Sequence, residues 1–463
     1  MLLSVLSFAF YLYCCWCQVL YYEYDVEGEA QHGFYVTITI GRPPQNIKLL
    51  IDTGSANFAV AVTPPLKSGS NNFFRYSNSN TFVKTSSHIA IQYVQGNWSG
   101  FLATDIVYVE KNRYVRCAIA CMSDVHNVFD INSMFSGILG LAYPAVAKPN
   151  SSISPFFDAI RKAQNINDVF SISLCGPSFS DSRGSDGKLH FGFISARYYS
   201  GKIMYSPITR ERLYEITLTT LRVGSKEIAV NCEELNDPRS SVDTGTTQLL
   251  VSSLVYNEII SKIKLHVSEE ESQSGVVGNV SKFWLNDTAA CVPKMYFNIS
   301  LFPDLFISFY HTDNSYFNLV ISPELYLLPF QEFSIENTCF TLGIGVSDVG
   351  TIVGSTLLKG YYVVFDRANK RIGFANSSFC LKEMSFVTMP SFLDSANFSN
   401  CKCVENNVQN DSITAGTIIL LVFILILAVL LLYRIIVWVQ AIRFQYSNNH
   451  LDTSNLVEED DKL

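Results

Sequence analysis

One short acidic motif occurs twice in the chain and constrains its fold more than any other feature. Ile-Asp-Thr-Gly-Ser at 51–55 recurs as Val-Asp-Thr-Gly-Thr at 242–246. An apolar-apolar-Gly triplet follows each copy at similar range, Ile-Leu-Gly at 138–140 and Ile-Val-Gly at 352–354. A single Asp-Thr-Gly is a weak signal, since composition alone gives about 0.1 per chain of this length, whereas two copies in the same frame are a much stronger one. The repeat therefore indicates an internal duplication, with one aspartate per half on a tight turn after a strand.

The residues around the repeat are typical of a β protein. Tyr, Phe, Ile, Val and Thr are frequent, and short alternating runs such as residues 34–40 end at Gly or Pro. Residues 41–44 form a turn before the next strand-like run at 47–51. Helical patterns are short, with the best at 154–163 and 253–265. This pattern of short alternating runs, together with the repeat, predicts an all-β fold built from two related halves.

Apolar blocks at the two ends predict a membrane topology. Residues 2–17 have the length of the hydrophobic region of a signal peptide, so we expect a signal peptide at 1–17. Residues 413–433 contain no charged residue and are long enough to span a bilayer, which predicts a transmembrane helix at 412–433. Arg434 and Arg443 follow this block, while Glu405 and Asp411 precede it. The positive-inside rule then predicts a single-pass type I membrane protein with a cytosolic tail at 434–463.

Sequons and cysteines agree with a secretory route. The chain contains more Asn-x-Ser/Thr sequons than chance provides, and it has 12 cysteines scattered rather than arranged as metal-binding pairs. The histidines are also dispersed, so we expect disulfides and no metal site. The candidate glycosylation sites are Asn150, Asn279, Asn286, Asn298, Asn376 and Asn397. Two further sequons lie at Asn97 and at Asn410, and Asn410 is close to the membrane span.

The charge balance excludes one class of partner. With 33 Lys and Arg against 41 Asp and Glu, the net charge is −8. A nucleic-acid binder would need a basic surface to neutralise phosphates, so no nucleic-acid partner is expected.

Two aspartates held side by side by such a duplication would have a specific chemistry. Like charges in close contact cannot both ionise, so the pair would share one proton and titrate as a unit. One carboxylate could act as general base on a water molecule, while the other donates a proton to a carbonyl oxygen or leaving group. The reaction indicated is hydrolysis of a peptide bond at mildly acid pH, with no cofactor and no metal.

Longer stretches of the sequence resemble the pepsin-type aspartic proteases, and among these most resemble the membrane-anchored β-secretases (memapsins). The resemblance covers roughly residues 33–380. The stretches that carry it are Gly33-Phe-Tyr-Val, Gly41-Arg-Pro-Pro-Gln45, the segment at 52–60, Gly137-Ile-Leu-Gly-Leu-Ala-Tyr143, Pro155-Phe-Phe-Asp158 and the segment at 360–375.

This resemblance implies a bilobal pepsin-like fold with the active-site cleft between the lobes. It implies an N-terminal lobe at 33–188, a C-terminal lobe at 189–385 and a stalk at 386–411, with a short segment at 18–32 in the position of a pro-segment.

The resemblance also assigns the residues of the site. Asp52 and Asp243 match the catalytic dyad. The residues that match the supporting loops are Thr53, Gly54, Ser55, Thr244, Gly245 and Thr246. Those that match the flap over the cleft are Tyr93, Gln95, Gly96 and Trp98. Asp366 and Arg367, two charges after an apolar strand, are interpreted as structural.

The resemblance also implies three disulfides in the C-terminal lobe. The matching pairs are Cys175 with Cys380, Cys291 with Cys339, and Cys232 with Cys401 or Cys403. Cys117 and Cys121 have no counterpart in that pattern. On one strand they would lie about 13 Å apart, too far to bridge, so one or both are expected as free thiols.

Some residues depart from the β-secretase pattern. Leu250 stands where β-secretases carry an arginine that helps to read polar or acidic substrate side chains. The Asn97 sequon lies in the flap, where a glycan would be expected to crowd the access of substrate. Residues 452–457 of the tail resemble an acidic dileucine signal, which predicts sorting adaptors as cytosolic partners.

Together these features predict a membrane-anchored aspartic endopeptidase. Its substrates would be polypeptides, foremost type I membrane proteins, because a shared membrane raises the effective concentration. Its active site would be lumenal or extracellular, in the Golgi, in endosomes or at the plasma membrane. The alternative is a catalytically silent binding protein or receptor on a protease scaffold, which the intact motifs disfavour.

Overall fold

The structure is a computed structural model of the chain. It describes residues 20–64, 72–93, 96–129, 133–176, 187–271, 284, 289–311, 315–330, 336–378, 380, 391–392 and 423–440. The chain divides into two compact units, residues 1–401 and residues 402–463. The expected signal peptide and the expected sorting signal in the tail lie outside the described residues.

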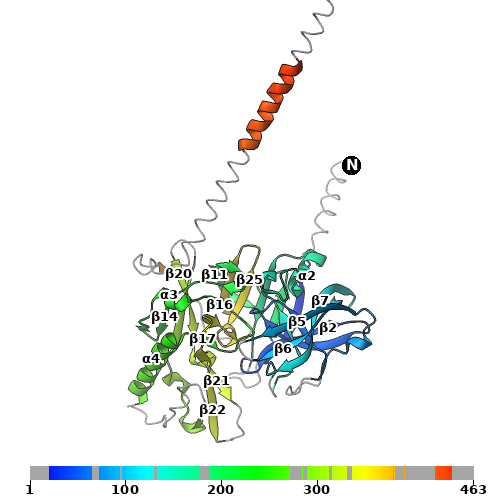
Figure 1. The fold of residues 1–463 in the computed structure, drawn as a ribbon. Helices are drawn as coiled ribbons and strands as arrows, with labels where there is room; N and C mark the ends of the chain where they lie inside the picture. The colour runs from blue at the N-terminus through cyan, green and yellow to red at the C-terminus, as the bar shows by residue number, and fades with distance from the viewer. Residues whose placement is uncertain are drawn as a thin grey trace, which may run out of the picture. The chain divides into compact units, whose positions relative to one another are not determined.

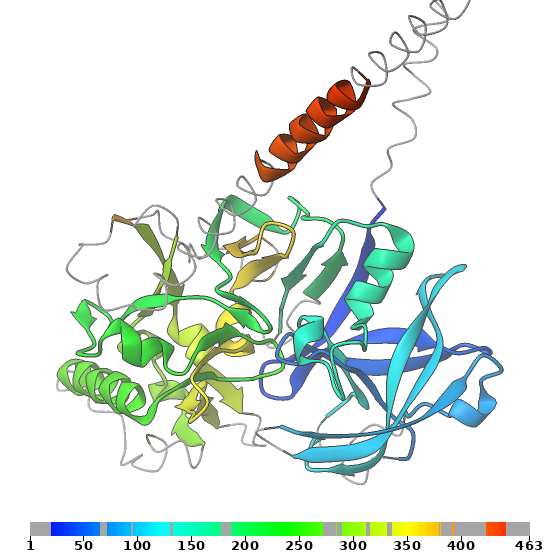
Figure 2. The same ribbon diagram turned by 45° about the horizontal axis from the view of Figure 1, so that its top comes forward.

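The first unit consists mainly of strands (Figures 1 and 2). The strands of its N-terminal half are β1 (Tyr22–Glu29), β2 (Gly33–Ile40), β3 (Gln45–Asp52), β4 (Phe58–Ala61), β5 (Val83–Gln92), β6 (Asn97–Glu110), β7 (Arg113–His126), β8 (Gly137–Gly140), β9 (Val169–Ser173) and β10 (Gly187–Phe191). Those of its C-terminal half are β11 (Tyr199–Pro207), β12 (Arg210–Glu211), β13 (Tyr214–Glu215), β14 (Leu218–Val223), β15 (Lys226–Glu227), β16 (Ser240–Val242), β17 (Leu249–Val251), β18 (Ala290–Pro293), β19 (Leu305–Tyr310), β20 (Ser315–Ile321), β21 (Leu327–Phe330), β22 (Asn337–Leu342), β23 (Ile344–Val346), β24 (Thr351–Val353), β25 (Tyr361–Asp366), β26 (Arg371–Ser377) and β27 (Ser391–Phe392).

Helices are few in the described part of this unit, and all but α4 are short. The two that the sequence predicts are present as α2 and α4, and α4 runs six residues beyond its expected end. The helices are α2 (Phe156–Gln164), α3 (Cys232–Asn236), α4 (Ser253–Glu271), α5 (Pro323–Tyr326) and α6 (Ser355–Leu358), with single 3-10 turns η1 (Tyr76–Asn78), η2 (Pro144–Val146), η4 (Lys294–Tyr296) and η5 (Ile299–Leu301).

The repeated motif corresponds to a repeated strand arrangement, which confirms the internal duplication. In the first half β8 lies between β3 and β4, parallel to β3 and antiparallel to β4. In the second half β24 lies between β16 and β17, parallel to β16 and antiparallel to β17. The two apolar-apolar-Gly triplets are these inserted strands, so each Asp-Thr-Gly loop is held against a buried central strand.

The two halves share one continuous sheet. Its order is β11-β26-β25-β9-β10-β1-β2-β3-β8-β4-β7-β6-β5, so β25 of the C-terminal half pairs with β9 of the N-terminal half. In Figures 1 and 2 the blue and cyan half and the green and yellow half lie on either side of this junction. The expected boundary at 188 falls inside β10, and the expected segment at 18–32 contains β1, which pairs with β10 and β2.

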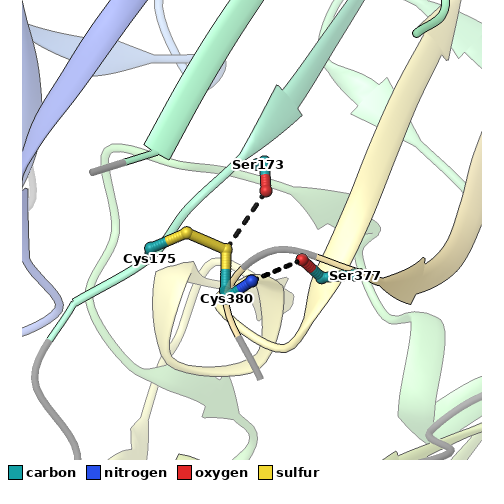
Figure 3. The surroundings of a disulfide bond; sticks show 4 residues. All are labelled: Ser173, Cys175, Ser377 and Cys380. Atoms are coloured by element: carbon teal, nitrogen blue, oxygen red, sulfur yellow. Dashed lines mark hydrogen bonds between the residues drawn. A yellow bond between two sulfur atoms is a disulfide. The ribbon is translucent and has the colours of Figure 1, made fainter. Parts of the chain in front are cut away.

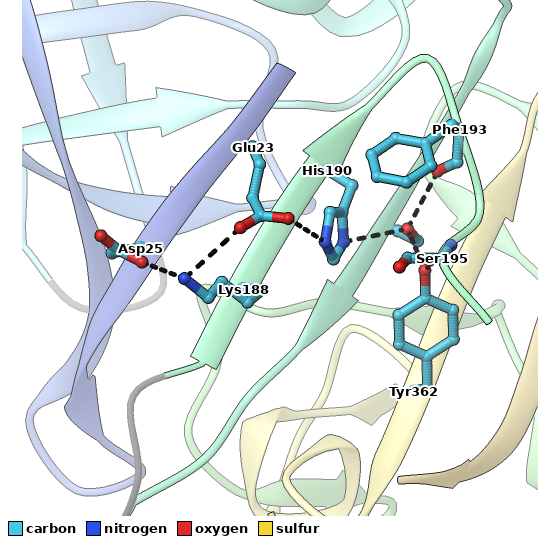
Figure 4. Close-up of polar contacts among 8 residues, drawn as sticks. Glu23, Asp25, Lys188, His190, Phe193, Ser195 and Tyr362 are labelled. Atoms are coloured by element: carbon cyan, nitrogen blue, oxygen red, sulfur yellow. Dashed lines mark hydrogen bonds and ion pairs between the residues drawn. The ribbon is translucent and has the colours of Figure 1, made fainter. Parts of the chain in front are cut away.

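A row of polar side chains crosses the shared sheet (Figure 4). His190 on β10 is fully buried; its Nε2 lies 3.2 Å from Glu23 of β1, and its Nδ1 lies 3.5 Å from the Ser171 hydroxyl on β9. Ser171 in turn is 2.6 Å from the Tyr362 hydroxyl on β25.

At the other end of this row, Lys188 binds both Glu23 and Asp25. The Tyr198 ring also packs on His190. This row therefore links strands of both halves.

Two of the expected disulfides are present, and a fifth cysteine is also bonded. Cys175 and Cys380 join the chain just after β9 to the chain just after β26, where the Cys380 backbone N–H donates to Ser377 Oγ at 3.1 Å (Figure 3). Cys291 and Cys339 join β18 to β22. Cys232 is disulfide-bonded too, while Cys401 and Cys403 lie outside the described residues.

The two remaining described cysteines are free thiols. Cys117 and Cys121 are both buried on β7, as expected for a pair that cannot bridge. Burial raises the pKa of each thiol to about 12. Because the thiolate is the reactive form, both are expected to be inert.

Arg367, which the sequence analysis interprets as structural, is buried at the junction of the two halves. Arg367 follows β25, and its side chain is only 4% exposed. Its guanidinium donates to both carboxylate oxygens of Asp158 on α2, at 3.0 and 2.7 Å. Its Nε lies 3.3 Å from Asp168, and it stacks over the Tyr143 ring. The bidentate geometry fastens α2 to the C-terminal half.

The second unit contains an apolar helix at Phe423–Gln440, whose mean hydropathy is 2.4 and which is not buried within the structure. Eighteen residues extend about 27 Å, close to the thickness of a hydrocarbon core. Of the span expected at 412–433, residues 412–422 lie outside the described residues. The helix continues past Tyr433 and includes Arg434. By length and composition it is a candidate single-pass membrane anchor.

Replacing Arg367 with Ala is expected to destabilise the fold by about 3–5 kcal/mol, because Asp158 would be left as a buried charge without a partner. Chemical unfolding of the full-length chain in detergent would measure the change. Arg116→Ala is the matched control, since that exposed arginine should cost under about 1 kcal/mol. Equal losses in the two variants would contradict the role assigned to Arg367.

Replacing His190 with Gln is expected to reduce the acid sensitivity of folding. Burial is the main cause that lowers the pKa of His190 below its ordinary 6.5, and Glu23 opposes it in part. The unfolded chain therefore binds more protons as the pH falls through 6.5, and the stability contributed by neutral His190 is present above that pH and lost below it.

The measurement is the free energy of unfolding at about pH 7.5 and about pH 5. The difference between the two values should shrink in His190→Gln and stay unchanged in the control His88→Gln, which alters an exposed histidine. An unchanged difference in His190→Gln would show that this histidine does not couple protonation to folding.

Candidate active site

Two loops meet where the halves of the first unit join. Asp52 is the last residue of β3, and Asp243 directly follows β16. Asp52 is 7% exposed, and Thr53 and Thr244 are almost completely buried. The inserted strands hold the loops in place, because Leu141 N–H donates to Asp52 O at 2.8 Å and Asp243 N–H donates to Val353 O at 3.0 Å.

The threonines of the two motifs form a crossed set of four hydrogen bonds. Thr53 N–H donates to Thr244 Oγ1 at 3.1 Å, and Thr244 N–H donates to Thr53 Oγ1 at 3.0 Å. Each hydroxyl then donates onward, Thr53 to Val242 O at 3.0 Å and Thr244 to Ile51 O at 2.7 Å. Every donor and acceptor in this buried set is satisfied by the opposite half, so the two loops are locked in one relative position.

The two carboxylates have matching hydrogen-bond partners. Gly54 N–H donates to Asp52 Oδ1 at 2.8 Å, and Gly245 N–H donates to Asp243 Oδ1 at 2.8 Å. The second oxygen of each carboxylate accepts from the residue after the glycine. Ser55 Oγ donates to Asp52 Oδ2, and Thr246 Oγ1 donates to Asp243 Oδ2 at 2.7 Å. The motif thus supplies each aspartate with its own donors at matching positions.

Each carboxylate lies directly against the glycine of the other loop. A Cβ atom placed on Gly54 would lie 2.6 Å from Asp243 Cγ, and one placed on Gly245 would lie 2.5 Å from Asp52 Oδ1. No side chain larger than hydrogen fits at either position. Burial, and next the charge of Asp243, raise the pKa of Asp52 well above its usual range. Two carboxylates in this arrangement can share one proton, because like charges so close together do not readily ionise at the same time.

A hairpin formed by β5 and β6 carries the sequence-identified flap residues. Tyr93 N–H donates to Gly96 O at 3.0 Å, and the buried Trp98 donates through Nε1 to the Tyr93 hydroxyl at 3.3 Å. Burial is the main cause that raises the pKa of Tyr93, and the nearby charge of Asp52 contributes. The Tyr93 hydroxyl therefore faces the carboxylate pair. Gln95 lies outside the described residues.

Two amide side chains that the sequence reasoning did not identify anchor the loops. Asn57 stands five residues after Asp52 and exchanges two hydrogen bonds with the Lys148 backbone, at 2.8 and 2.9 Å. Gln248 stands five residues after Asp243 and donates to Leu342 O at 2.9 Å. The equivalent position in each repeat was a signal that could have identified both residues.

The site is made of hydrogen-bonded carboxylates. Among the residues that the structure describes, no group of three or more His, Cys, Asp or Glu side chains could hold a metal ion. The chemistry available from the described side chains is proton transfer between two neighbouring carboxyl groups.

The duplicated strand arrangement and the paired carboxylates define a pepsin-like bilobal β protein. Residues 33–377 match the family Eukaryotic aspartyl protease, and the chain belongs to that family. It is accordingly an aspartic-type endopeptidase, a hydrolase of peptide bonds.

Three curated relatives show how the similarity is distributed. A beta-secretase of Strongylocentrotus purpuratus is 33% identical over 374 residues, covering 76% of this chain and 68% of the relative. Pepsin-2B of Gadus morhua is 27% identical over 362 residues, covering 76% of this chain and 98% of the relative. Pepsin A of Gallus gallus is 28% identical over 357 residues, covering 74% and 84% respectively.

Replacing Gly54 with Ala is expected to lower peptide cleavage by about 10²-fold or more, because the new methyl group must displace the Asp243 carboxylate. The ratio kcat/KM on a peptide substrate measures the loss, and circular dichroism checks the fold. Gly176→Ala is the matched control, since its Cβ would meet its nearest atoms at an ordinary 3.5 Å. A folded Gly54→Ala variant with wild-type kcat/KM would contradict this geometry.

Proposed function

We propose that Asp52 and Asp243 are the catalytic dyad of a membrane-anchored aspartic endopeptidase of the β-secretase type. The observation that carries the proposal is the matched pair of carboxylates, each held by its own glycine N–H and hydroxyl and placed against the glycine of the other loop. Structural aspartates on unrelated turns would have no reason to meet in this way.

The dyad would work by proton transfer within the pair. With one proton shared, the ionised carboxylate takes a proton from the attacking water as the water oxygen bonds to the peptide carbonyl carbon. The protonated carboxyl donates to the carbonyl oxygen, which stabilises the negative charge that develops there. Collapse of the tetrahedral intermediate passes a proton to the leaving nitrogen and breaks the C–N bond, and the dyad again holds one proton.

The surrounding groups keep this proton on the pair. The four crossed bonds of Thr53 and Thr244 prevent the carboxylates from moving apart. Tyr93 from the flap faces the pair and, with substrate bound, would help to exclude water. Because the pKa of Asp52 is raised, the singly protonated dyad should persist at acidic pH, and activity should fall when the pH rises far enough to remove this one remaining proton.

Features outside the dyad support a membrane-tethered protease acting on membrane-protein ectodomains. The apolar helix at Phe423–Gln440 can anchor the chain, the disulfides favour the secretory pathway, and one relative is a beta-secretase. A shared membrane would raise the effective concentration of anchored substrates. In β17, the half-buried Leu250 would favour apolar rather than acidic substrate side chains.

The decisive experiment compares the full-length wild type with Asp243→Asn against a peptide library at about pH 4 to about pH 6. Wild type should cleave, and the variant should lose at least about 10²–10⁴-fold because the pair can no longer exchange a proton. Asp304→Asn, which changes an exposed carboxylate just before β19 and outside both Asp-Thr-Gly loops, serves as the matched control and should keep activity. Absence of any cleavage specific to wild type would instead indicate a silent binding protein.

A further inference from the structure

Asn97 lies on the opposite face of the flap from the carboxylate pair. It is the first residue of β6, pairs with Gln92 on β5 and with His126 on β7, and is exposed. The next residue, Trp98, is buried and donates to the Tyr93 hydroxyl, which faces Asp52. Since side chains alternate along a strand, Asn97 points away from the face that carries Trp98.

The sequon as a whole shares this outer face. Ser99, two residues along β6, is also exposed and pairs with Ala90 on β5 and Asp124 on β7. Among the described residues, neither the Asn97 amide nor the Ser99 hydroxyl takes part in a side-chain hydrogen bond. Both groups that a sequon requires are therefore free and lie side by side, about 7 Å apart along the strand.

A groove continues the outer face beyond Ser99. It has a volume of about 450 Å³ and is lined by His88, Ile89, Ala90, Ser99, Gly100, Phe101 and Ser123, from strands β5, β6 and β7. Gly100 in this lining has no room for a side chain, because a Cβ atom there would collide with the Cys121 backbone. The exposed groups at its rim, His88 and Ser123, are polar. Ile89, Ala90 and Phe101 add apolar surface to the lining. Such a mixed lining suits a sugar, whose hydroxyl and acetamido groups can bond to the polar rim while its ring packs on apolar side chains.

We propose that Asn97 carries an N-linked glycan whose first sugars lie in this groove on the outer face of the flap. The proposal rests on the secretory placement in the proposed function. In the modification, Asn97 Nδ2 loses a proton and bonds to the anomeric carbon of a lipid-pyrophosphate-linked oligosaccharide, while the anomeric C–O bond breaks and the lipid pyrophosphate leaves. The host cell supplies this donor and the transferring enzyme.

The placement changes what a glycan in the flap would do. An inward-pointing Asn97 would bring sugar over the cleft and crowd the substrate, as the sequence alone suggests. The outward-pointing Asn97 leaves the Tyr93 and Trp98 face clear. A glycan seated in the groove would bridge β5, β6 and β7, so it would brace the hairpin and cover its exposed backbone without obstructing the dyad.

The first test maps the modification on the full-length chain, expressed in a eukaryotic cell and extracted from its membranes with detergent. Glycopeptide mass spectrometry should find Asn97 occupied, together with the exposed sequons Asn150 and Asn298. Ser99→Ala should remove the glycan from Asn97 alone, and Ser99→Thr, which preserves the sequon, should retain it. An unmodified Asn97 on a chain glycosylated at Asn150 or Asn298 would overturn the proposal.

The second test measures where the glycan lies. Hydrogen exchange of peptides covering residues 88–101 should be faster in Ser99→Ala than in wild type or Ser99→Thr, and faster in folded wild type after endoglycosidase treatment. The kcat/KM on a short peptide should stay within about twofold, since the substrate face is unchanged. Equal exchange in all samples, or a rise of about tenfold in kcat/KM without the glycan, would overturn the placement.

These outcomes are separable from failure of the proposed function. Loss of the difference between wild type and Asp243→Asn would refute the dyad while leaving the glycan map intact. A chain without glycan at any sequon would refute the secretory placement and the Asn97 proposal together, whatever its cleavage activity.

Discussion

The rest of the site depends on the crossed hydrogen bonds between Thr53 and Thr244. Each half of the molecule contributes one backbone N–H and one hydroxyl, and each is satisfied only by the other half. In a buried setting an unmatched donor or acceptor costs about 1–3 kcal/mol, so the set opposes any displacement of one loop relative to the other. These hydrogen bonds fix the positions of the two carboxylates. The repulsion between the carboxylates is therefore opposed by hydrogen bonds that do not involve the reacting atoms.

Much of this site could be predicted because the duplicated sequence contains the same motif in both halves. Asp, Thr, Gly and the following hydroxyl residue occur at the same spacing in both halves, and their roles follow from their chemistry. The disulfides Cys175–Cys380 and Cys291–Cys339 came from family resemblance, since sequence spacing alone cannot choose partners. The position of Asn97 on the outer face could not be read from the sequon, because the direction of a side chain depends on strand register.

Residues that join the halves were harder to predict, since each has a partner far away in the chain. Arg367 was identified as structural, but its partner Asp158 was not, because it lies on a helix of the other half. His190 and Glu23 meet only because β1 and β10 are neighbours in the shared sheet. Asn57 and Gln248 stand at the same position in the two repeats, but the backbone groups that they bind, at Lys148 and Leu342, have no sequence signature. The missing information in each case was a contact between residues that are far apart in the sequence.

The shared sheet also orders events during synthesis of the chain. β1, the first strand to emerge, needs β10 as a neighbour, and β10 needs β9, whose other edge is completed only by β25 near the end of the protease region. The N-terminal half can begin to fold early, but the edge of β9 stays unpaired until residues 361–366 have been made. An unpaired edge is prone to wrong pairing. Translation speed and chaperones that bind exposed strand edges should therefore affect the yield of this protein more than that of a chain whose sheets close within each half.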